Sequence, residues 1–362
     1  GSVTLGGKAL TLTAGTGTFS GVISGAGSLT QSGTGTQVLS GANTYTGGTT
    51  VSSGATLKLS AAGSIASSSV VTATGTFDIS GTTSGTSSIK SLAGSGAVTL
   101  GGKALTLTAG NDTFSGVISG AGSLTQSGTG TETLSGVNTY TGVTLVSSGA
   151  TLALSGTGSI STSTRVSVAG TFDISGTTSG ASIKSLAGSG AVTLGGKALT
   201  LTAGNDTFDG VISGTGTVTV SGGTQILSGA NTYTGSTTIS SGATLKLSGP
   251  ASIASSSGVT ATGTFDISGT GGTPIKSLAG AGTVTLGSQA LTLTAAAGTF
   301  SGAIGGTGAL TVSGGTETLS GVNTYTGATT VSSGATLALS GTGSIATSSL
   351  VTATGTFDIS GT

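Results

Sequence analysis

Residues 40–60 read SGANTYTGGTTVSSGATLKLS, and nearly the same string returns at residues 135–155, 228–248 and 320–340. The tyrosine of this string recurs after 95, 93 and 92 residues. The aspartate of a second string, TFDIS, recurs at the same three separations. Because the register of whole units is maintained, we predict that the chain is an array of repeats.

The boundaries of the repeats follow from this register. We expect a single repeat array over residues 1–362, with units at 1–95, 96–189, 190–281 and 282–362, the last of them incomplete. The chain opens directly on repeat sequence, so no signal peptide is predicted in it. The array is interpreted as a window cut from a longer one.

Constant and variable residues alternate within the strings. Leu57 and Leu59 recur in every unit, whereas Lys58 between them is replaced by alanine in two units. Successive side chains of a strand point to opposite faces, so this alternation predicts a strand with one buried face and one exposed face. The segment KALTLT shows the same alternation, with Leu10 and Leu12 expected inside.

Composition favours short strands over helices and over disorder. The chain has 72 glycines and two prolines, and no unit contains a helical pattern of ten or more residues. A mean hydropathy of +0.40 and a net formal charge of zero indicate apolar surface to bury. Short strands and turns give coils of roughly 18 to 22 residues with three strands each, and about five coils per unit. We therefore predict an all-β fold, a right-handed parallel β-helix (β-solenoid) that forms a continuous rod.

The NTYTG motif is interpreted as a structural element. Glycine and asparagine are expected to take left-handed turn conformations between strands, and each tyrosine to cap one corner of the core. An asparagine ladder is not expected, because the motif would return only about every 24 Å along the rod. The structural motif residues are Asn43, Tyr45, Gly47, Asn138, Tyr140, Gly142, Asn231, Tyr233, Gly235, Asn323, Tyr325 and Gly327.

The four strings resemble the passenger-associated repeat of bacterial autotransporters, with the consensus L-S-G-x-N-T-Y-T-G-x-T-T-V-x-x-G-x-L-x-L. The second string departs from it at Leu145, an outward position by alternation, where the others have threonine. The resemblance implies a passenger of type V secretion, located at the cell surface or outside the cell of a Gram-negative bacterium. It implies membrane contact only through a translocator absent from this chain. The lack of cysteine suits a chain that is exported unfolded.

The resemblance also implies a non-enzymatic structural or adhesive segment, which acts as a rigid stalk or in cell-cell and surface adhesion. Nine basic and nine acidic residues balance, so two such rods can approach without strong repulsion. We expect self-association, side by side or end to end, or binding to a cell or abiotic surface. The basic residues form no stripe, so no nucleic-acid partner is expected. The ligand is unknown.

A polysaccharide-active enzyme on the same fold is the first alternative. Glycoside hydrolysis needs two carboxylates within about 5 to 10 Å, and only Asp206 and Asp209 are near neighbours along the chain. The chain has no histidine for a Ser-His-Asp arrangement. The repeated lysines Lys90, Lys184 and Lys276 have no evident catalytic partner. No catalytic residue and no cofactor is therefore expected.

Two further site hypotheses are weaker. The Asn111–Asp112 turn lacks the G-G-x-G-x-D spacing of calcium-binding repeats, so no metal site is expected, and Arg165 lacks the charged neighbours of a lyase cleft. Ice binding is the second alternative, because the T-x-T pair of Thr11 and Thr13 recurs in each unit. Such arrays need a pair on every coil, whereas here one pair is expected in about five coils.

Overall fold

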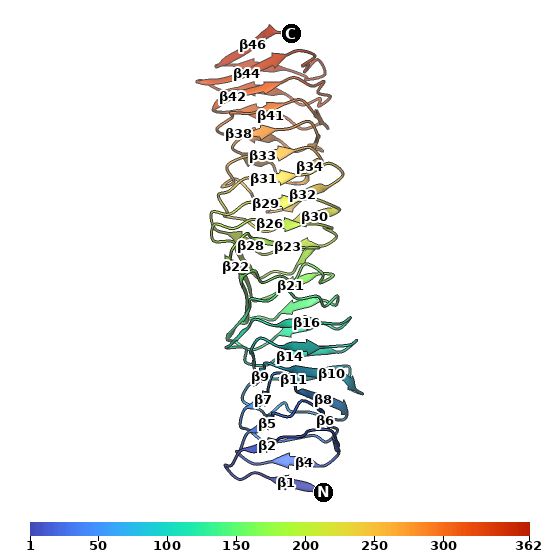
Figure 1. Ribbon diagram of the computed structural model, residues 1–362. Coiled ribbons are helices and arrows are strands. Elements are labelled where there is room, and N and C mark those ends of the chain that lie inside the picture. Colours follow the sequence, from blue (N-terminus) through green and yellow to red (C-terminus); the bar gives the residue numbers. More distant parts are fainter. The chain divides into compact units, whose positions relative to one another are not determined.

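The computed structural model describes residues 1–362 as two compact units, Gly1–Lys184 and Ser185–Thr362. Each unit consists of short strands joined by turns, and neither contains a helix (Figure 1). In particular, no helix is long and apolar enough to cross a membrane. The predicted all-β class is confirmed, while the single array over all residues stays a prediction.

The strands are two to seven residues long. The strands of the first unit are β1 (Ser2–Thr4), β2 (Leu10–Leu12), β3 (Thr18–Phe19), β4 (Val22–Ser24), β5 (Leu29–Gln31), β6 (Thr36–Leu39), β7 (Thr49–Val51), β8 (Thr56–Ala61), β9 (Val71–Ala73), β10 (Thr76–Thr82), β11 (Thr86–Ile89), β12 (Leu92–Ala93), β13 (Ala97–Thr99), β14 (Ala104–Leu107), β15 (Thr113–Phe114), β16 (Val117–Ser119), β17 (Leu124–Gln126), β18 (Thr131–Leu134), β19 (Thr144–Val146), β20 (Thr151–Gly156), β21 (Val166–Val168), β22 (Thr171–Thr177) and β23 (Ala181–Ile183). The strands of the second unit are β24 (Leu186–Ala187), β25 (Ala191–Thr193), β26 (Leu199–Leu201), β27 (Thr207–Phe208), β28 (Val211–Ser213), β29 (Val218–Val220), β30 (Thr224–Leu227), β31 (Thr237–Ile239), β32 (Thr244–Gly249), β33 (Val259–Ala261), β34 (Thr264–Thr270), β35 (Thr273–Ile275), β36 (Leu278–Ala279), β37 (Thr283–Thr285), β38 (Leu291–Leu293), β39 (Thr299–Phe300), β40 (Ala303–Gly305), β41 (Leu310–Val312), β42 (Gly315–Leu319), β43 (Thr329–Val331), β44 (Ala335–Ser340), β45 (Val351–Ala353) and β46 (Thr356–Gly361).

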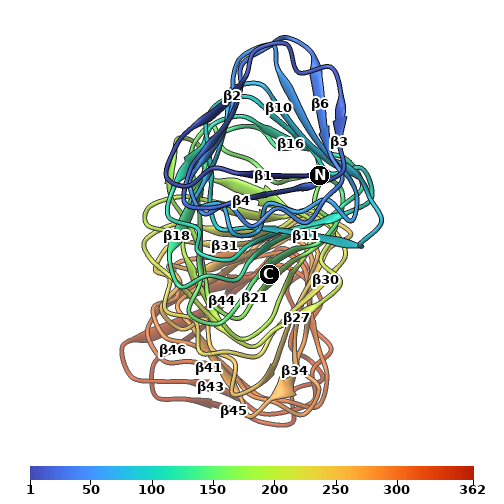
Figure 2. The same cartoon turned by 90° about the horizontal axis from the view of Figure 1, so that it is seen from below.

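Within each unit the strands of successive circuits pair in parallel. In the first unit Leu10 pairs with Leu29, which is followed along the same sheet by Thr49 and Val71, so one circuit takes 19 to 22 residues. Viewed end-on, the first circuits have β2 on one side, β3 and β6 on a second, and β1 and β4 on a third (Figure 2). The predicted parallel β-solenoid is confirmed, but three strands per circuit holds only in part, because the circuits that begin at β5 and β7 contain two strands each.

A repeat is not a whole number of circuits. Strand pairing leads from Thr18 to Thr99 in four circuits and to Ser119 in a fifth. The counterpart of Thr18 in the second repeat is Thr113, which lies between these two residues. Equivalent strands therefore lie in different sheets: β2, β5, β7 and β9 share one sheet, and their counterparts β14, β17, β19 and β21 share another. The prediction of about five circuits per repeat is thus slightly too high, because the turn lengths leave each repeat short of five full circuits.

The interior contains the alternate residues that the sequence predicts. Leu57 and Leu59 of β8 are buried, while Lys58 between them is partly exposed. In β10, Phe77 and Ile79 are buried. Parallel pairing places Leu57 beside Phe77, so apolar side chains stack directly from one circuit to the next. Each such side chain contributes about 1.5 to 3 kcal/mol when it is fully buried.

Left-handed backbone is almost confined to glycine. Among the other residues only Ala61 has a positive φ, of 50°, and glycines occupy the same position in the later repeats, with φ of 58° to 59°. This residue lies beside a β-bulge between β8 and β10. The motif asparagines have no positive φ, so the prediction that they take left-handed turn conformations is wrong.

Candidate functional site

The asparagine of the NTYTG motif holds three successive circuits together. The Oδ1 atom of Asn43 accepts a hydrogen bond from the main-chain N–H of Ile23 at 2.9 Å, one circuit earlier. Its Nδ2 group donates to the carbonyl oxygens of Gly41 at 2.8 Å and of Ser64, in the next circuit, at 3.0 Å. The same three bonds form at the other three asparagines, Asn138, Asn231 and Asn323.

The tyrosine of the motif lies inside the core, where it begins a chain of buried hydroxyls. The Tyr45 hydroxyl lies 2.6 Å from Thr49 Oγ1, which lies 2.8 Å from Ser68 Oγ in the next circuit. Ser68 in turn donates to the carbonyl of Gly47 at 2.9 Å. Burial raises the pKa of all four motif tyrosines, that of Tyr233 and Tyr325 to about 12. The tyrosine rings thus lie inside the core, with their hydroxyls in a hydrogen-bond network, and are not caps at the edge of the core.

The glycine that ends the motif permits close contact between circuits. A Cβ atom on Gly47 would lie 2.4 Å from the carbonyl oxygen of Gly27. The counterparts Gly142, Gly235 and Gly327 would meet the equivalent carbonyl oxygen at 2.2 to 2.3 Å. Sequence reasoning identified the asparagine, tyrosine and glycine, but it missed the threonine and serine partners, because the serine lies one circuit away.

A further set of inward polar residues also escaped the sequence analysis. Gln37, Glu132, Gln225 and Glu317 occupy the same position in the four repeats, and all are buried. Their inward orientation could have been predicted from the alternation of the strand, because Leu134 faces the core two residues after Glu132. Burial raises the pKa of both glutamates to about 8.

The other charged candidates are engaged in local contacts. Lys58 Nζ lies 3.0 Å from an Asp78 carboxylate oxygen in the adjacent circuit, and the same ion pair recurs between Lys246 and Asp266 at 3.3 Å. Burial tends to raise the pKa of Asp78, but hydrogen bonds from Ser80 and Lys58 outweigh this and lower it. An aspartate held in this way is stabilised as an anion and is not prepared to act as a general acid.

Two further charged candidates, Asp209 and Lys276, make hydrogen bonds to serine residues of other circuits. Asp209 accepts a hydrogen bond from Ser228 Oγ, in the adjacent circuit. Lys276 donates to the carbonyl oxygen of Ser255 at 3.1 Å. Arg165 and Asp206 also have interaction partners. The partners of Asp209 and Lys276 are thus serine residues of other circuits, and neither serine is a candidate catalytic residue.

Hydroxyl side chains form ladders on the outer faces of the sheets. Thr11 of β2 pairs in register with Thr30, and Thr50 and Thr72 follow in the next two circuits. A second hydroxyl follows two residues later, directly after the end of each strand, at Thr13, Ser32, Ser52 and Thr74. The third and fourth repeats carry the same ladder, whereas the second is interrupted at Leu145. The expectation of one pair in about five coils is therefore wrong, because other segments supply T-x-S and T-x-T pairs in between.

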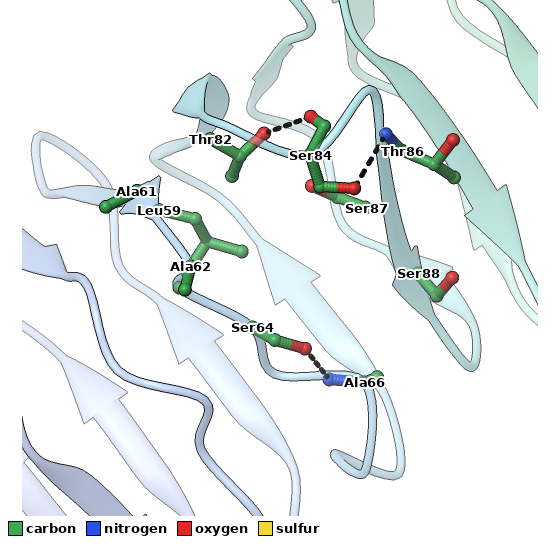
Figure 3. Close-up of a pocket in the computed structure, with 11 residues that line it drawn as sticks. Leu59, Ala61, Ala62, Ser64, Ala66, Thr82, Ser84, Thr86, Ser87 and Ser88 are labelled. Carbon is green, nitrogen blue, oxygen red and sulfur yellow. Dashed lines mark hydrogen bonds between the residues drawn. The ribbon is translucent and has the colours of Figure 1, made fainter.

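In the first two repeats, the loop that follows the TFDIS strand borders a small surface cavity. In the first repeat the cavity measures about 230 Å³, and its lining residues include Ser64, Ser84, Thr86 and Ser88 (Figure 3). Ser84 Oγ accepts a hydrogen bond from the N–H of Thr86 at 3.2 Å, and Ser64 Oγ accepts one from Ala66 at 3.3 Å. The second repeat has a counterpart of about 260 Å³, also lined by serine, threonine, glycine and alanine. Neither cavity contains a charged or aromatic side chain in its lining.

Comparison with known proteins identifies the repeated motif. The family model of the passenger-associated-transport-repeat matches residues 29–59, 124–154, 221–247 and 314–339. Each matched segment contains one NTYTG motif. No curated protein and no solved structure matches the chain.

Proposed function

Because the chain is an autotransporter passenger built on passenger-associated transport repeats, we propose that it is a non-enzymatic structural and adhesive segment. It acts as a stalk or associates with further copies of itself on neighbouring cells. Passengers with these repeats are displayed at the surface of Gram-negative bacteria or outside the cell.

The observation that carries this proposal is the contrast between the inside and the outside of each unit. The polar groups of the NTYTG motif bond to neighbouring circuits, so they serve the fold. The outer faces carry ladders of threonine and serine, and the whole chain has no net formal charge. Two such faces can approach without strong repulsion and exchange hydrogen bonds side by side.

Mixing differently labelled cells tests the adhesive role. One population displays the chain and the other either displays it or lacks it. Self-association predicts mixed clusters only when both populations display the chain. Clusters that include cells without the chain would indicate a different receptor, and dispersed cells would indicate a passive stalk.

A charged variant of an outer face makes this test specific. Thr219 and Thr238 are neighbours in register on the outer side of one sheet, so Thr219→Lys with Thr238→Lys adds two positive charges without touching the core. The like charges on approaching faces repel, so we expect weaker clustering at low salt and partial recovery at high salt. Undiminished clustering would show that this face takes no part.

Ice binding is a second candidate, and the hydroxyl ladders are the observation that favours it. Three repeats carry paired hydroxyls on four consecutive circuits. Thermal hysteresis at millimolar protein would support this function, and freezing identical to that of buffer would exclude it. Thr238→Leu is the matched control, since leucine occupies the same position at Leu145.

A further inference from the structure

Both glutamates of the chain lie in its core. Glu132 on β18 and Glu317 on β42 are 0% exposed, and the chain has no other glutamate. Parallel pairing places Glu132 beside Leu152 and Glu317 beside Leu337, which are also fully buried. Each glutamate is therefore removed from water, which disfavours the charged form of its carboxyl group.

The third repeat shows what this position requires of a side chain. Gln225 stands there, and its Nε2 group donates to the carbonyl oxygens of Leu186 at 2.8 Å, Asp206 at 2.9 Å and Ile226 at 3.1 Å. Its Oε1 atom accepts a hydrogen bond from the N–H of Leu186 at 3.2 Å. The main chain around this position therefore offers acceptors as well as a donor, and the amide of glutamine meets both.

The second and fourth repeats place a carboxyl group against the equivalent main chain. The residues equivalent to Leu186 and Asp206 are Leu92 and Asp112 around Glu132, and Leu278 and Gly298 around Glu317. A carboxylate only accepts hydrogen bonds, whereas a protonated carboxyl group has one O–H to donate. Glu132 Oε1 and both carboxyl oxygens of Glu317 have no hydrogen-bond partner.

Few groups around either glutamate oppose the effect of burial on its pKa. At Glu132, the Ser91 hydroxyl donates at 3.2 Å, and the main chain of Asp112 and Leu92 also lowers the pKa, while the Asp112 carboxylate raises it. At Glu317 the main chain of Leu278 and Gly298 lowers the pKa. Gly298 stands where the second repeat has Asp112. No lysine or arginine contributes to either shift, so burial dominates.

We propose that Glu132 and Glu317 are held in the core as neutral carboxylic acids and make each unit less stable as the medium becomes alkaline. In the unfolded chain a glutamate loses its proton near its ordinary pKa of 4.5, whereas the folded pKa of these two is about 8. Between these values the folded state holds a proton that the unfolded state has released, so unfolding becomes more favourable as pH rises. The unfolding equilibrium constant increases up to tenfold per pH unit for each glutamate in this window, and the contribution is constant outside it.

Direct titration of the two carboxyl groups tests this proposal in the intact chain. With ¹³C-labelled glutamate, the 362-residue chain gives two side-chain carboxyl signals in NMR spectra, because it contains two glutamates. We expect both signals to titrate with midpoints near pH 8 in the folded chain. Midpoints near the unfolded value would overturn the proposal.

Denaturant unfolding between pH 5 and pH 9 tests the effect on stability. Glu132→Gln and Glu317→Gln, combined, introduce the residue that the first and third repeats already carry. The double variant should lose the decline in stability between about pH 5 and 8 and should exceed the wild type at pH 8.5. An unchanged decline in the double variant would contradict the proposal. If the double variant fails to fold, Gln225→Glu gives the reverse test, because it should add a third increment to the decline.

Discussion

The NTYTG corner and the loop after TFDIS are both turns between strands, but they are held in different ways. At the corner, all four repeats have the same length, and the hydroxyl of the tyrosine lies 2.6 to 2.7 Å from the threonine. The loop differs between repeats: six residues separate Thr82 from Ile89, five separate Thr177 from Ile183, and four separate the equivalent pair in the third repeat.

The difference teaches that a buried side chain bonded to two neighbouring circuits fixes the length and sequence of a turn. At the corner, Asn43 bonds to residues about 20 positions away in both directions along the chain. In the loop, the bond from Thr86 to Ser84 spans two residues, and the bonds to other circuits are made by Thr83 and by the main-chain oxygen of Gly85. A turn of the second kind can gain or lose a residue without disturbing its neighbours.

Removal of an asparagine should give the largest effect. Asn138→Ala deletes one hydrogen bond from Ile118 and two to Gly136 and Ser159. Because the freed main-chain groups are buried, we expect a loss of about 3 to 5 kcal/mol in the free energy of unfolding, measured by denaturant titration. Ser84→Ala, in the loop, is the control and should cost less than about 0.5 kcal/mol. Similar losses in the two variants would remove the distinction between corner and loop.

A pair of glycine substitutions sharpens the same contrast. Gly47→Ala places a Cβ 2.4 Å from the carbonyl oxygen of Gly27, so the circuits must separate, and we expect a loss of about 2 to 3 kcal/mol. Gly85, in the loop, has open space around it and no positive φ. Gly85→Ala should therefore leave the thermal midpoint unchanged or slightly raised. A large loss at Gly85 would mean that the loop is more constrained than its contacts indicate.

Loss of a single hydroxyl should have an intermediate effect. Tyr140→Phe keeps the buried ring but removes the hydrogen bond to Thr144, which retains its bond to Ser163 at 3.0 Å. We expect a loss of about 1 to 1.5 kcal/mol, again by denaturant titration. No measurable change would show that the hydroxyl chain is dispensable and that the ring alone fixes the corner.

The smallest effect should be a gain, at the last residue of β8. Ala61 has a φ of 50°, where the other three repeats have glycine. Relief of this strain in Ala61→Gly should stabilise the chain by about 1 kcal/mol, visible as a higher thermal midpoint. Destabilisation would show that the alanine methyl group makes a contact that outweighs the backbone strain.

The sequence predicted those features that depend on neighbouring residues. The exchange of Lys58 for alanine between constant leucines revealed which face is buried, because alternation is a local property of a strand. The circuit length followed from short strands and short turns, and the register confirms it.

Features that depend on the register between circuits could not be predicted in the same way. The threonine ladder joins Thr11, Thr30 and Thr50 from three unlike segments, and only the pairing shows that they are adjacent. The bonds of Asn43 depend on the same pairing. The burial of Glu132 could have been predicted, because it lies two residues before the buried Leu134 on the same strand. The alternation rule, however, expects apolar residues at inward positions, and a glutamate there contradicts it.

Because a repeat contains a fractional number of circuits, the same surface segment lies on different sheets in successive repeats of one unit. Within the first unit, the ladder at β2, β5, β7 and β9 and its counterpart at β14, β17, β19 and β21 belong to separate sheets. A partner that approaches from one azimuth therefore meets different segments in succession instead of a single motif in multiple copies. The two ladders of this unit, the second of them interrupted at Leu145, therefore belong to different faces. A binding patch grafted into both copies of the first unit would for the same reason form no continuous stripe along one flank.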